Sequence, residues 1–372
     1  MKKILFVFGT RPEAIKMAPL VKKFQKNSQI FETKICVTAQ HREMLDQVLD
    51  FFKIEPHYDL DIMKPGQSLF DVTINSLKGL QSVLEDFNPD LIFVQGDTTT
   101  VLTGAIAGFY SRINVAHLEA GLRSGDKNSP FPEEVNRILA GHISSFHFAP
   151  TERAVNNLKK EGITKNVWNV GNTVIDALFL GLDIINEGGE DKYESYFSFI
   201  DFSERIILVT GHRRESFGEP FMNMCSALKE IAEKHKNVEI VYPVHLNPNV
   251  REPVNKILKG VKRIHLIEPL SYPYLIWLMN KSYLVLTDSG GIQEEAPSLG
   301  KPVLVMRDVT ERTEGIDAGT ALLVGTNKEK IITETNKLLN NSDYYEGMSK
   351  AVNPYGDGNT SKRIVDILAE NL

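Results

Sequence analysis

The chain has 372 residues, enough for two domains of about 150 to 200 residues that each bury their own core. Apolar residues make up 42% and charged residues 24%, proportions typical of globular proteins and unlike those of disordered, collagenous or coiled-coil chains. The formal net charge of -6 offers no basic field for a nucleic acid or an anionic membrane surface. We therefore expect neither of those partners.

The two cysteines, Cys36 and Cys225, lie far apart and outside any Cys-x-x-Cys pair. Neither a disulfide framework nor a cysteine zinc site is expected, and a reducing cytoplasm fits this pattern. The apolar run at residues 4–8 is interrupted by Gly9-Thr10-Arg11-Pro12, so it predicts a buried strand and not a signal peptide. No apolar stretch approaches the ~20 residues of a membrane-spanning helix. We expect a cytoplasmic protein with no membrane partner and no bound metal.

Short apolar runs alternate with longer amphipathic segments along the whole chain, a pattern typical of parallel sheets buried on both faces. The strands expected in the first half are residues 4–8, 33–38, 91–95, 114–118, 146–149 and 167–170. The strands expected in the second half are residues 205–210, 238–242, 264–267, 283–287, 303–306 and 321–324. The sequence therefore predicts two doubly wound α/β domains, at residues 1–170 and 171–357, with a polar stretch at 185–203 near the junction and a final amphipathic helix.

Polar residues follow the predicted strands of the first domain, at the edge of the sheet where ligands of such folds bind. Gly9-Thr10-Arg11-Pro12 opens a helix whose free N–H groups, with Arg11, could meet an anion, although a plain glycine turn explains it equally well. Asp97 could simply cap the next helix. Glu119 emerges from an apolar run and is harder to explain as solvated surface. Glu133 and Glu134 precede a helix predicted over 135–144, where two acids are ordinary.

The second domain places a histidine and two arginines at one strand end, in Gly211-His212-Arg213-Arg214-Glu215. His245 lies in a proline-bounded loop, where a lone histidine is more often structural. Asp288-Ser289-Gly290-Gly291 opens a helix whose N–H groups can cradle a diphosphate. Glu295, one turn further, could hold both hydroxyls of a ribose. The alternative is a serine-capped helix with glycines for packing, and Arg312 could lie in a solvated loop.

Six motifs of this sequence are informative when they are taken together. They are Gly9-Thr10-Arg11-Pro12-Glu13-Ala14, Gln95-Gly96-Asp97-Thr98-Thr99, His117-Leu118-Glu119-Ala120-Gly121-Leu122-Arg123, Pro132-Glu133-Glu134, Gly211-His212-Arg213-Arg214-Glu215 and Asp288-Ser289-Gly290-Gly291. In this order they resemble the bacterial non-hydrolysing UDP-N-acetylglucosamine 2-epimerases. The resemblance spans nearly the whole chain, and the joint occurrence of the motifs is very hard to obtain by chance.

The resemblance implies two Rossmann-like doubly wound domains that face a central cleft, as in the glycosyltransferase-B architecture, with a C-terminal helix at 358–372 that packs back on the first domain. It implies a homodimer that interconverts UDP-N-acetylglucosamine and UDP-N-acetylmannosamine without a cofactor, for cell-surface polysaccharide biosynthesis. UDP is eliminated to leave a 2-acetamidoglucal intermediate and is then added back. The sequence agrees with the absence of a nicotinamide cofactor, since the turn after the first strand lacks Gly-x-Gly-x-x-Gly.

The resemblance also implies roles for individual residues. Asp97, Glu119 and Glu133 would be the acid, the base and the electrostatic group that act on the sugar, with Glu134 as the substitute for Glu133. His212 would steady the departing diphosphate and could protonate it. The positions expected to bind UDP are Arg11, Lys16, His245, Ser289, Gly290, Glu295 and Arg312.

Bacterial members of the family bind a second UDP-N-acetylglucosamine as an effector through a Gln-His-Arg-Gln stretch. The matching residues here are Gln40, His41 and Arg42, followed by Glu43. Gly66 stands where some members carry an arginine. These residues are the expected effector site, and they depart from the family pattern at two positions.

Three other functions remain open. A hydrolysing epimerase would release N-acetylmannosamine and UDP, and water access to the glycal decides between the two enzymes. A glycosyltransferase-B-type transferase would use the same UDP cradle with a base for an acceptor hydroxyl. A nucleotide-sugar sensor would bind without turnover and would have no need of three acids opposite His212.

Overall fold

The computed structural model describes residues 1–38, 42–64 and 66–372, and the chain forms two compact units. Unit 1 comprises Met1–Leu180 and Tyr355–Leu372, and unit 2 comprises Gly181–Pro354. The first passage between the units lies within one continuous helix, α7 (Thr173–Gly188), and the second lies just before Tyr355. These boundaries differ from the sequence-based division at residues 170 and 357, because α7 is one unbroken helix and the returning segment pairs with unit 1 from Tyr355 onward.

Unit 1 is built on a seven-stranded parallel sheet of order β3-β2-β1-β4-β5-β6-β7. Its strands are β1 (Lys2–Phe8), β2 (Phe31–Val37), β3 (Tyr58–Asp59), β4 (Leu91–Gln95), β5 (Asn114–Leu118), β6 (Phe146–Ala149) and β7 (Val167–Asn169). Its helices are α1 (Arg11–Lys26), α2 (Arg42–Phe52), α3 (Leu69–Phe87), α4 (Thr99–Tyr110), α5 (Glu133–Ile143), α6 (Glu152–Lys160) and α16 (Thr360–Asn371), with the first part of α7. The strand order reverses between β1 and β4, and such a switch point is where ligands of these folds bind.

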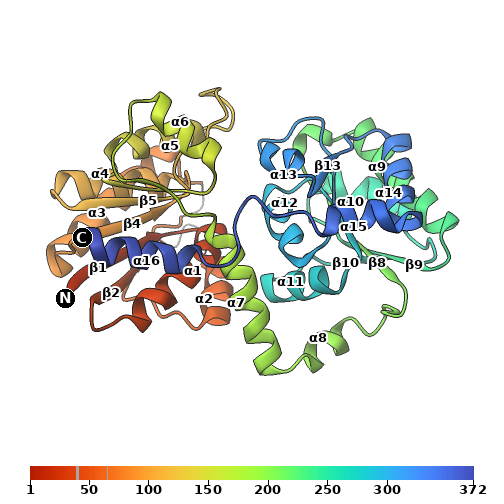
Figure 1. Ribbon diagram of the computed structural model, residues 1–372, viewed down its shortest axis with the longest axis horizontal. Helices are drawn as coiled ribbons and strands as arrows, with labels where there is room; N and C mark the ends of the chain where they lie inside the picture. Colours follow the sequence, from red (N-terminus) through yellow and green to blue (C-terminus); the bar gives the residue numbers. More distant parts are fainter. Residues whose placement is uncertain (39–41, 65) are drawn as a thin grey trace. The chain divides into compact units, whose positions relative to one another are not determined.

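Helices cover both faces of this sheet (Figure 1). Leu5 and Val7 of β1 belong to a buried cluster with α3, α4 and α5, whereas Phe6 packs its ring against Phe24 of α1, with 5.5 Å between centroids. Successive residues of a strand point to opposite faces, so β1 must be apolar throughout. α16 packs against α1, which brings the end of the chain onto unit 1.

Unit 2 repeats this plan with a six-stranded parallel sheet of order β10-β9-β8-β11-β12-β13. Its strands are β8 (Arg205–Thr210), β9 (Val238–Pro243), β10 (Ile264–Ile267), β11 (Leu284–Thr287), β12 (Val303–Val305) and β13 (Ala321–Leu323). Its helices are the remainder of α7, α8 (Asp191–Tyr196), η1 (Arg214–Ser216), α9 (Glu219–Lys234), α10 (Pro248–Leu258), α11 (Tyr272–Lys281), α12 (Gly290–Glu295), η2 (Ala296–Leu299), α13 (Thr313–Asp317), α14 (Lys328–Asn340) and α15 (Ser342–Ser349). Its switch point lies between β8 and β11.

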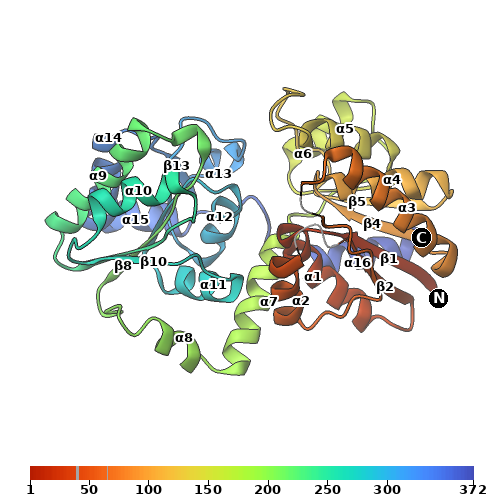
Figure 2. The same ribbon diagram turned by 180° about the vertical axis from the view of Figure 1, so that it is seen from behind.

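Ile207 and Val209 of β8 belong to one buried cluster of unit 2, with residues of α9, α10 and α14. These three helices are labelled beside the sheet in Figure 2. Beside α11 the rings of Phe197 and Trp277 stack, with centroids 5.3 Å apart. The polar stretch expected near the domain junction is thus helical over α8 and is anchored by aromatic packing. Side chains from this stretch reach α11, as when Trp277 Nε1 donates a 2.9 Å hydrogen bond to Glu190.

The predicted α/β class is confirmed, and each of the expected strands forms. The short strand β3 was not predicted, because two residues carry no periodic signal. α5 begins at Glu133, two residues before the expected start. Among residues 1–38, 42–64 and 66–372, no helix combines the length and apolarity needed to cross a bilayer.

Candidate functional site

The turns after β1 and β4 are tied together by one buried carboxylate, that of Glu13. Glu13 Oε2 accepts the backbone N–H groups of Gly9 at 2.9 Å and Thr10 at 2.7 Å, and Thr98 donates its hydroxyl to Oε1 at 2.5 Å. Burial raises the pKa of Glu13, and these hydrogen bonds act against that rise. The hydrogen bonds of Glu13 therefore fix the two turns at the switch point of unit 1 relative to each other.

Glu119 lies directly after β5 in the left-handed region, with φ of 65°. Its Oε1 accepts hydrogen bonds from Lys16 Nζ at 2.6 Å and from the Asn172 amide at 3.0 Å, and its Oε2 accepts one from the Gln95 amide at 2.5 Å. Only 7% of the side chain is exposed. Three donors, one of them charged, thus fix a nearly buried carboxylate beyond the carboxyl end of the sheet.

Asp97 follows β4, the strand next to β5, and it is paired with Arg137 of α5. The Arg137 guanidinium donates to Asp97 Oδ2, and the Asn136 amide donates to the Asp97 carbonyl at 2.9 Å. Gly96 has φ of 80° and lets the backbone turn here; a Cβ on it would lie 3.6 Å from Oε2 of Glu119. The two strand ends therefore bring the acidic residues Asp97 and Glu119 into one region.

The two acids at the start of α5 have different environments. Glu134 is 1% exposed, accepts the backbone N–H groups of Ser124 and Gly125 at 3.0 to 3.1 Å, and pairs with Arg137 at 3.1 Å. Glu133 is half-buried at the first position of the helix. Glu134 thus holds the preceding loop onto α5, which is a structural task, and the choice of Glu133 for the sugar stays a prediction.

In unit 2 the switch point between β8 and β11 brings His212 and Asp288 together. Asp288 Oδ2 accepts the backbone N–H groups of His212 at 2.6 Å and Arg213 at 2.7 Å. The His212 ring stacks on that of His245, with 5.1 Å between centroids and 10° between planes. Three strand ends thus contribute to one cluster of titratable side chains.

Beyond β11, Glu295 accepts a 3.0 Å hydrogen bond from the Tyr272 hydroxyl, and both residues are buried. Burial, followed by the nearby Glu295 charge, raises the pKa of Tyr272 well above its usual value. Arg312 bonds to Glu294 at 2.8 Å and lies against Gly290, where a Cβ would approach the guanidinium carbon to 3.4 Å. Glycine at 290 therefore leaves room for this arginine over the start of α12.

The structure sorts the predicted site residues into two groups. Unit 1 holds the residues Arg11, Lys16, Asp97, Glu119 and Glu133, and unit 2 holds the residues His212, His245, Ser289, Gly290, Glu295 and Arg312. Gln40 and His41 lie outside the described residues, and Arg42 is the first residue of α2. The effector site thus stays a prediction.

Several residues with direct contacts to these groups were not selected from the sequence. Gln95, Arg137, Asn172 and Asp288 are four examples. Gln95 and Asp288 stand inside quoted motifs, and a polar side chain at the end of an apolar strand could have marked each of them. Arg137 and Asn172 carry no such mark, because their partners are 40 and 53 residues away in sequence. Within the described ranges, no cluster of three or more His, Cys, Asp and Glu side chains is arranged to hold a metal ion.

The profile of the UDP-N-acetylglucosamine 2-epimerases matches residues 22–369 of this sequence. The chain belongs to that family. The UDP-N-acetylglucosamine 2-epimerase of Yersinia pestis is 58% identical over 369 residues, covering 98% of each chain. The enzyme of the same name from Escherichia coli K12 is 56% identical over 372 residues, covering 99% of each chain.

A solved structure supports the same family assignment. The UDP-GlcNAc 2-epimerase of Neisseria meningitidis, bound to UDP-GlcNAc, superposes with a TM-score of 0.91 at 51% identity, covering 99% of this chain and 100% of that one. The family resemblance read from the sequence motifs is confirmed. This family member therefore carries an epimerase fold over nearly its whole length.

Proposed function

We propose that this chain is a non-hydrolysing UDP-N-acetylglucosamine 2-epimerase, which interconverts UDP-N-acetylglucosamine and UDP-N-acetylmannosamine. The observation that carries the proposal is the pair of carboxylates at neighbouring strand ends, Glu119 held by three donors and Asp97 held by Arg137. The Neisseria meningitidis relative, whose structure contains UDP-GlcNAc, suggests the substrate.

The proposed reaction begins as the bond between C1 and the UDP oxygen breaks, with its electron pair leaving on the β-phosphate. Because the C2 proton is only weakly acidic, positive charge develops on the sugar ring before that proton is lost, and fixed carboxylates stabilise this charge. One carboxylate then removes the C2 proton to form the 2-acetamidoglucal. A second acid returns a proton to the opposite face of C2, and UDP adds back to C1.

Asp97, Glu119 and Glu133 are proposed to supply between them the acid, the base and the electrostatic group of these steps. Lys16 pairs with Glu119 and Arg137 pairs with Asp97, so a cationic side chain holds each of these two carboxylates in place. A carboxylate held in this way costs little reorganisation when charge appears on the sugar.

His245, Ser289, Gly290, Glu295 and Arg312 of unit 2 are proposed to bind UDP, and a role in UDP binding is proposed separately for Arg11 and Lys16 of unit 1. The buried Glu295 carboxylate would take the ribose hydroxyls. The Ser289-Gly290 turn, with Arg312 beside Gly290, would bind the diphosphate, and His212 and His245 would flank the departing oxygen.

Product analysis separates this proposal from its closest alternatives. Incubation should convert either nucleotide sugar to the same stable mixture, with UDP and free sugar at trace levels. Accumulating N-acetylmannosamine and UDP would indicate the hydrolysing reaction. A protein that changes neither compound and needs an acceptor would be a transferase.

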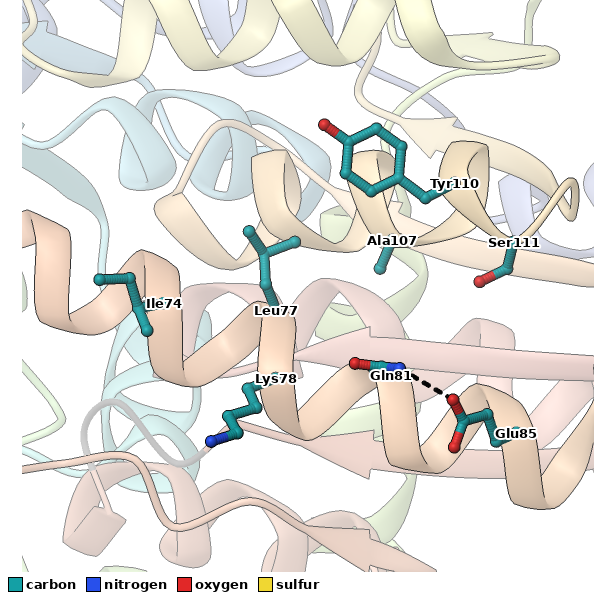
Figure 3. A pocket seen from close by; sticks show the side chains of 8 residues that line it. All are labelled: Ile74, Leu77, Lys78, Gln81, Glu85, Ala107, Tyr110 and Ser111. Carbon is teal, nitrogen blue, oxygen red and sulfur yellow. Dashed lines mark hydrogen bonds between the residues drawn. The ribbon is translucent and has the colours of Figure 1, made fainter.

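We also propose that two copies associate through an apolar face on α3 and α4. A groove of about 560 Å³ between these helices is lined by Ile74, Leu77, Lys78, Gln81, Glu85, Ala107, Tyr110 and Ser111 (Figure 3). Tyr110 is 77% exposed and Ile74 is 60% exposed, a costly arrangement unless a partner covers them. The flanking charges, Lys78 and Glu85, lie two helical turns apart, so a two-fold axis would set the lysine of each copy against the glutamate of the other.

Regulation and location remain proposals drawn from the sequence. A second UDP-N-acetylglucosamine would act at Gln40, His41 and Arg42 as an effector, giving a sigmoidal dependence of rate on substrate that changing Gln40 abolishes. A hyperbolic dependence in the unchanged protein would contradict this. The two free cysteines are buried, which suits a reducing cytoplasm.

A further inference from the structure

Asp288 is a fully buried carboxylate whose two oxygens have different surroundings. Oδ2 accepts two backbone hydrogen bonds, from His212 at 2.6 Å and from Arg213 at 2.7 Å. Oδ1 is buried and has no hydrogen-bond partner among the residues that the structure describes. A buried acceptor without a donor costs free energy, so a nearby group that could donate to Oδ1 would stabilise it.

That neighbour is the imidazole of His212, whose Nδ1 lies 3.6 Å from Asp288 Oδ1. The His212 side chain is 43% exposed, and its ring stacks on His245. His245 is itself oriented, because its Nδ1 accepts the Asn247 N–H at 3.1 Å. The His212 ring therefore has a carboxylate at its Nδ1 edge and an oriented ring against one face.

We propose that Asp288 is the positioning carboxylate of His212. A shift of a few tenths of an ångström when a ligand binds lets Nδ1–H donate to Asp288 Oδ1, and this bond fixes Nε2 as the nitrogen that acts on the ligand. Asp288 also stabilises the imidazolium form, against the charge of Arg213 and any charge on His245, the other titratable or charged groups that the described contacts place around the ring.

This inference rests on the proposed function, in which His212 serves the departing diphosphate. As the C1–O bond breaks, its electron pair moves to the β-phosphate oxygen, and the imidazolium gives its Nε2 proton to the diphosphate. Re-addition of UDP returns that proton to Nε2. Asp288 remains a carboxylate throughout and touches no reacting atom, in the manner of the carboxylate that orients a catalytic histidine.

A purely structural role for Asp288 makes a different prediction. If Asp288 only clamps the turn after β8, Asp288→Asn should be harmless, because an amide oxygen can still accept the N–H groups of His212 and Arg213. If Asp288 also orients the ring, the same variant must be damaging, since an NH₂ group then faces Nδ1 and cannot accept its proton.

The test compares Asp288→Asn, His212→Gln and the double variant of the full chain. We expect Asp288→Asn to lower kcat about 100-fold or more while the Kd for UDP, measured by calorimetry, stays within about threefold. The double variant should turn over no more slowly than His212→Gln alone. Unchanged turnover in Asp288→Asn, or losses that multiply in the double variant, would overturn the proposal.

Nuclear magnetic resonance of the histidine rings in the complex with UDP, which does not turn over by itself, gives an independent reading. In the unaltered protein the His212 signal, identified by its absence from His212→Gln, should show a protonated Nδ1 in the neutral ring. A neutral ring protonated at Nε2 would refute the pairing even if Asp288→Asn failed to fold. Because this reading needs no turnover, correct pairing in a protein without epimerase activity would refute the proposed function and leave the pairing intact.

Discussion

The side-chain amide of Asn172 donates a 3.0 Å hydrogen bond to Oε1 of Glu119. The same asparagine accepts the Val174 N–H at 3.0 Å at the start of α7, and its backbone N–H donates to the Tyr355 carbonyl at 2.7 Å. α7 contains the first passage of the chain between the units, and Tyr355 directly follows the second. A proposed catalytic carboxylate is therefore bonded to the residue at which both passages meet unit 1.

Replacing Asn172 by alanine should slow turnover without weakening the binding of UDP. A hydrogen-bond donor to Glu119 is lost, so we expect kcat to fall by about 10- to 100-fold, corresponding to about 1 to 3 kcal/mol. The matched control is Asn327→Ala, which removes a side-chain cap from α14 without touching any proposed site residue. Both variants should lose about 1 kcal/mol of stability, measured by urea unfolding. Equal turnover in the two would show that the contact with Glu119 has no catalytic value.

Asp97→Asn should abolish turnover and preserve UDP binding, because Asp97 is proposed to act on the sugar. We expect kcat to fall by at least about 100-fold, with a calorimetric Kd for UDP within a few-fold. Asp90→Asn is the control, since Asp90 is exposed at the opposite end of the same strand. Near-normal turnover in Asp97→Asn would remove this residue from the site.

Glu295→Ala should weaken the binding of UDP. The variant lacks the buried carboxylate that is proposed to bind both ribose hydroxyls, so we expect the Kd for UDP to rise by about 10-fold or more. Glu346→Ala removes an exposed carboxylate that is paired with Lys350, and it should leave the Kd unchanged. An unchanged affinity in Glu295→Ala would place the ribose elsewhere.

Tyr110→Glu should dissociate the proposed dimer, because it sets a charge in the apolar groove between α3 and α4. Sedimentation velocity should show a single species of dimer mass for the unaltered chain and of monomer mass for the variant. Val352→Glu alters an apolar residue of unit 2 that is 84% exposed and should remain dimeric. A dimer that survives Tyr110→Glu would place the interface on another face.

Stability should decrease as the pH falls from about 6.5 to about 4. Burial lowers the pKa of His117 and of His147 to about 4, so in this range the unfolded chain binds protons that the folded chain does not. The loss amounts to about 3 kcal/mol at most for each histidine. Glu13 and Asp176 act in the opposite direction, since burial raises the pKa of each.

A pair of variants isolates the histidine effect. His147→Gln should flatten the dependence of the urea-unfolding free energy on pH over this range. His142→Gln is the matched control, a change at a histidine whose side chain is 50% exposed. Identical curves for the unaltered chain and His147→Gln would show that His147 does not titrate in this range.

The sequence predicts both sheets well because each buried parallel strand is a continuous apolar run bounded by turns. The sequence also singles out Glu119 as a candidate site residue, because a carboxylate at the end of a buried apolar run needs hydrogen-bond partners. The partners themselves escape prediction: Lys16, Gln95 and Asn172 reach Glu119 from three different elements, and only the tertiary fold brings them together. The choice between Glu133 and Glu134 likewise depends on which of them the loop at Ser124 captures.

The central claim is that UDP leaves and returns while the C2 proton is exchanged. A proton NMR time course of the protein with UDP-N-acetylglucosamine in deuterated water tests it most directly. The account predicts loss of the C2 proton signal from the nucleotide sugars as UDP-N-acetylmannosamine grows to a stable fraction. Epimerisation that retains the C2 proton, or a spectrum that does not change, would contradict it.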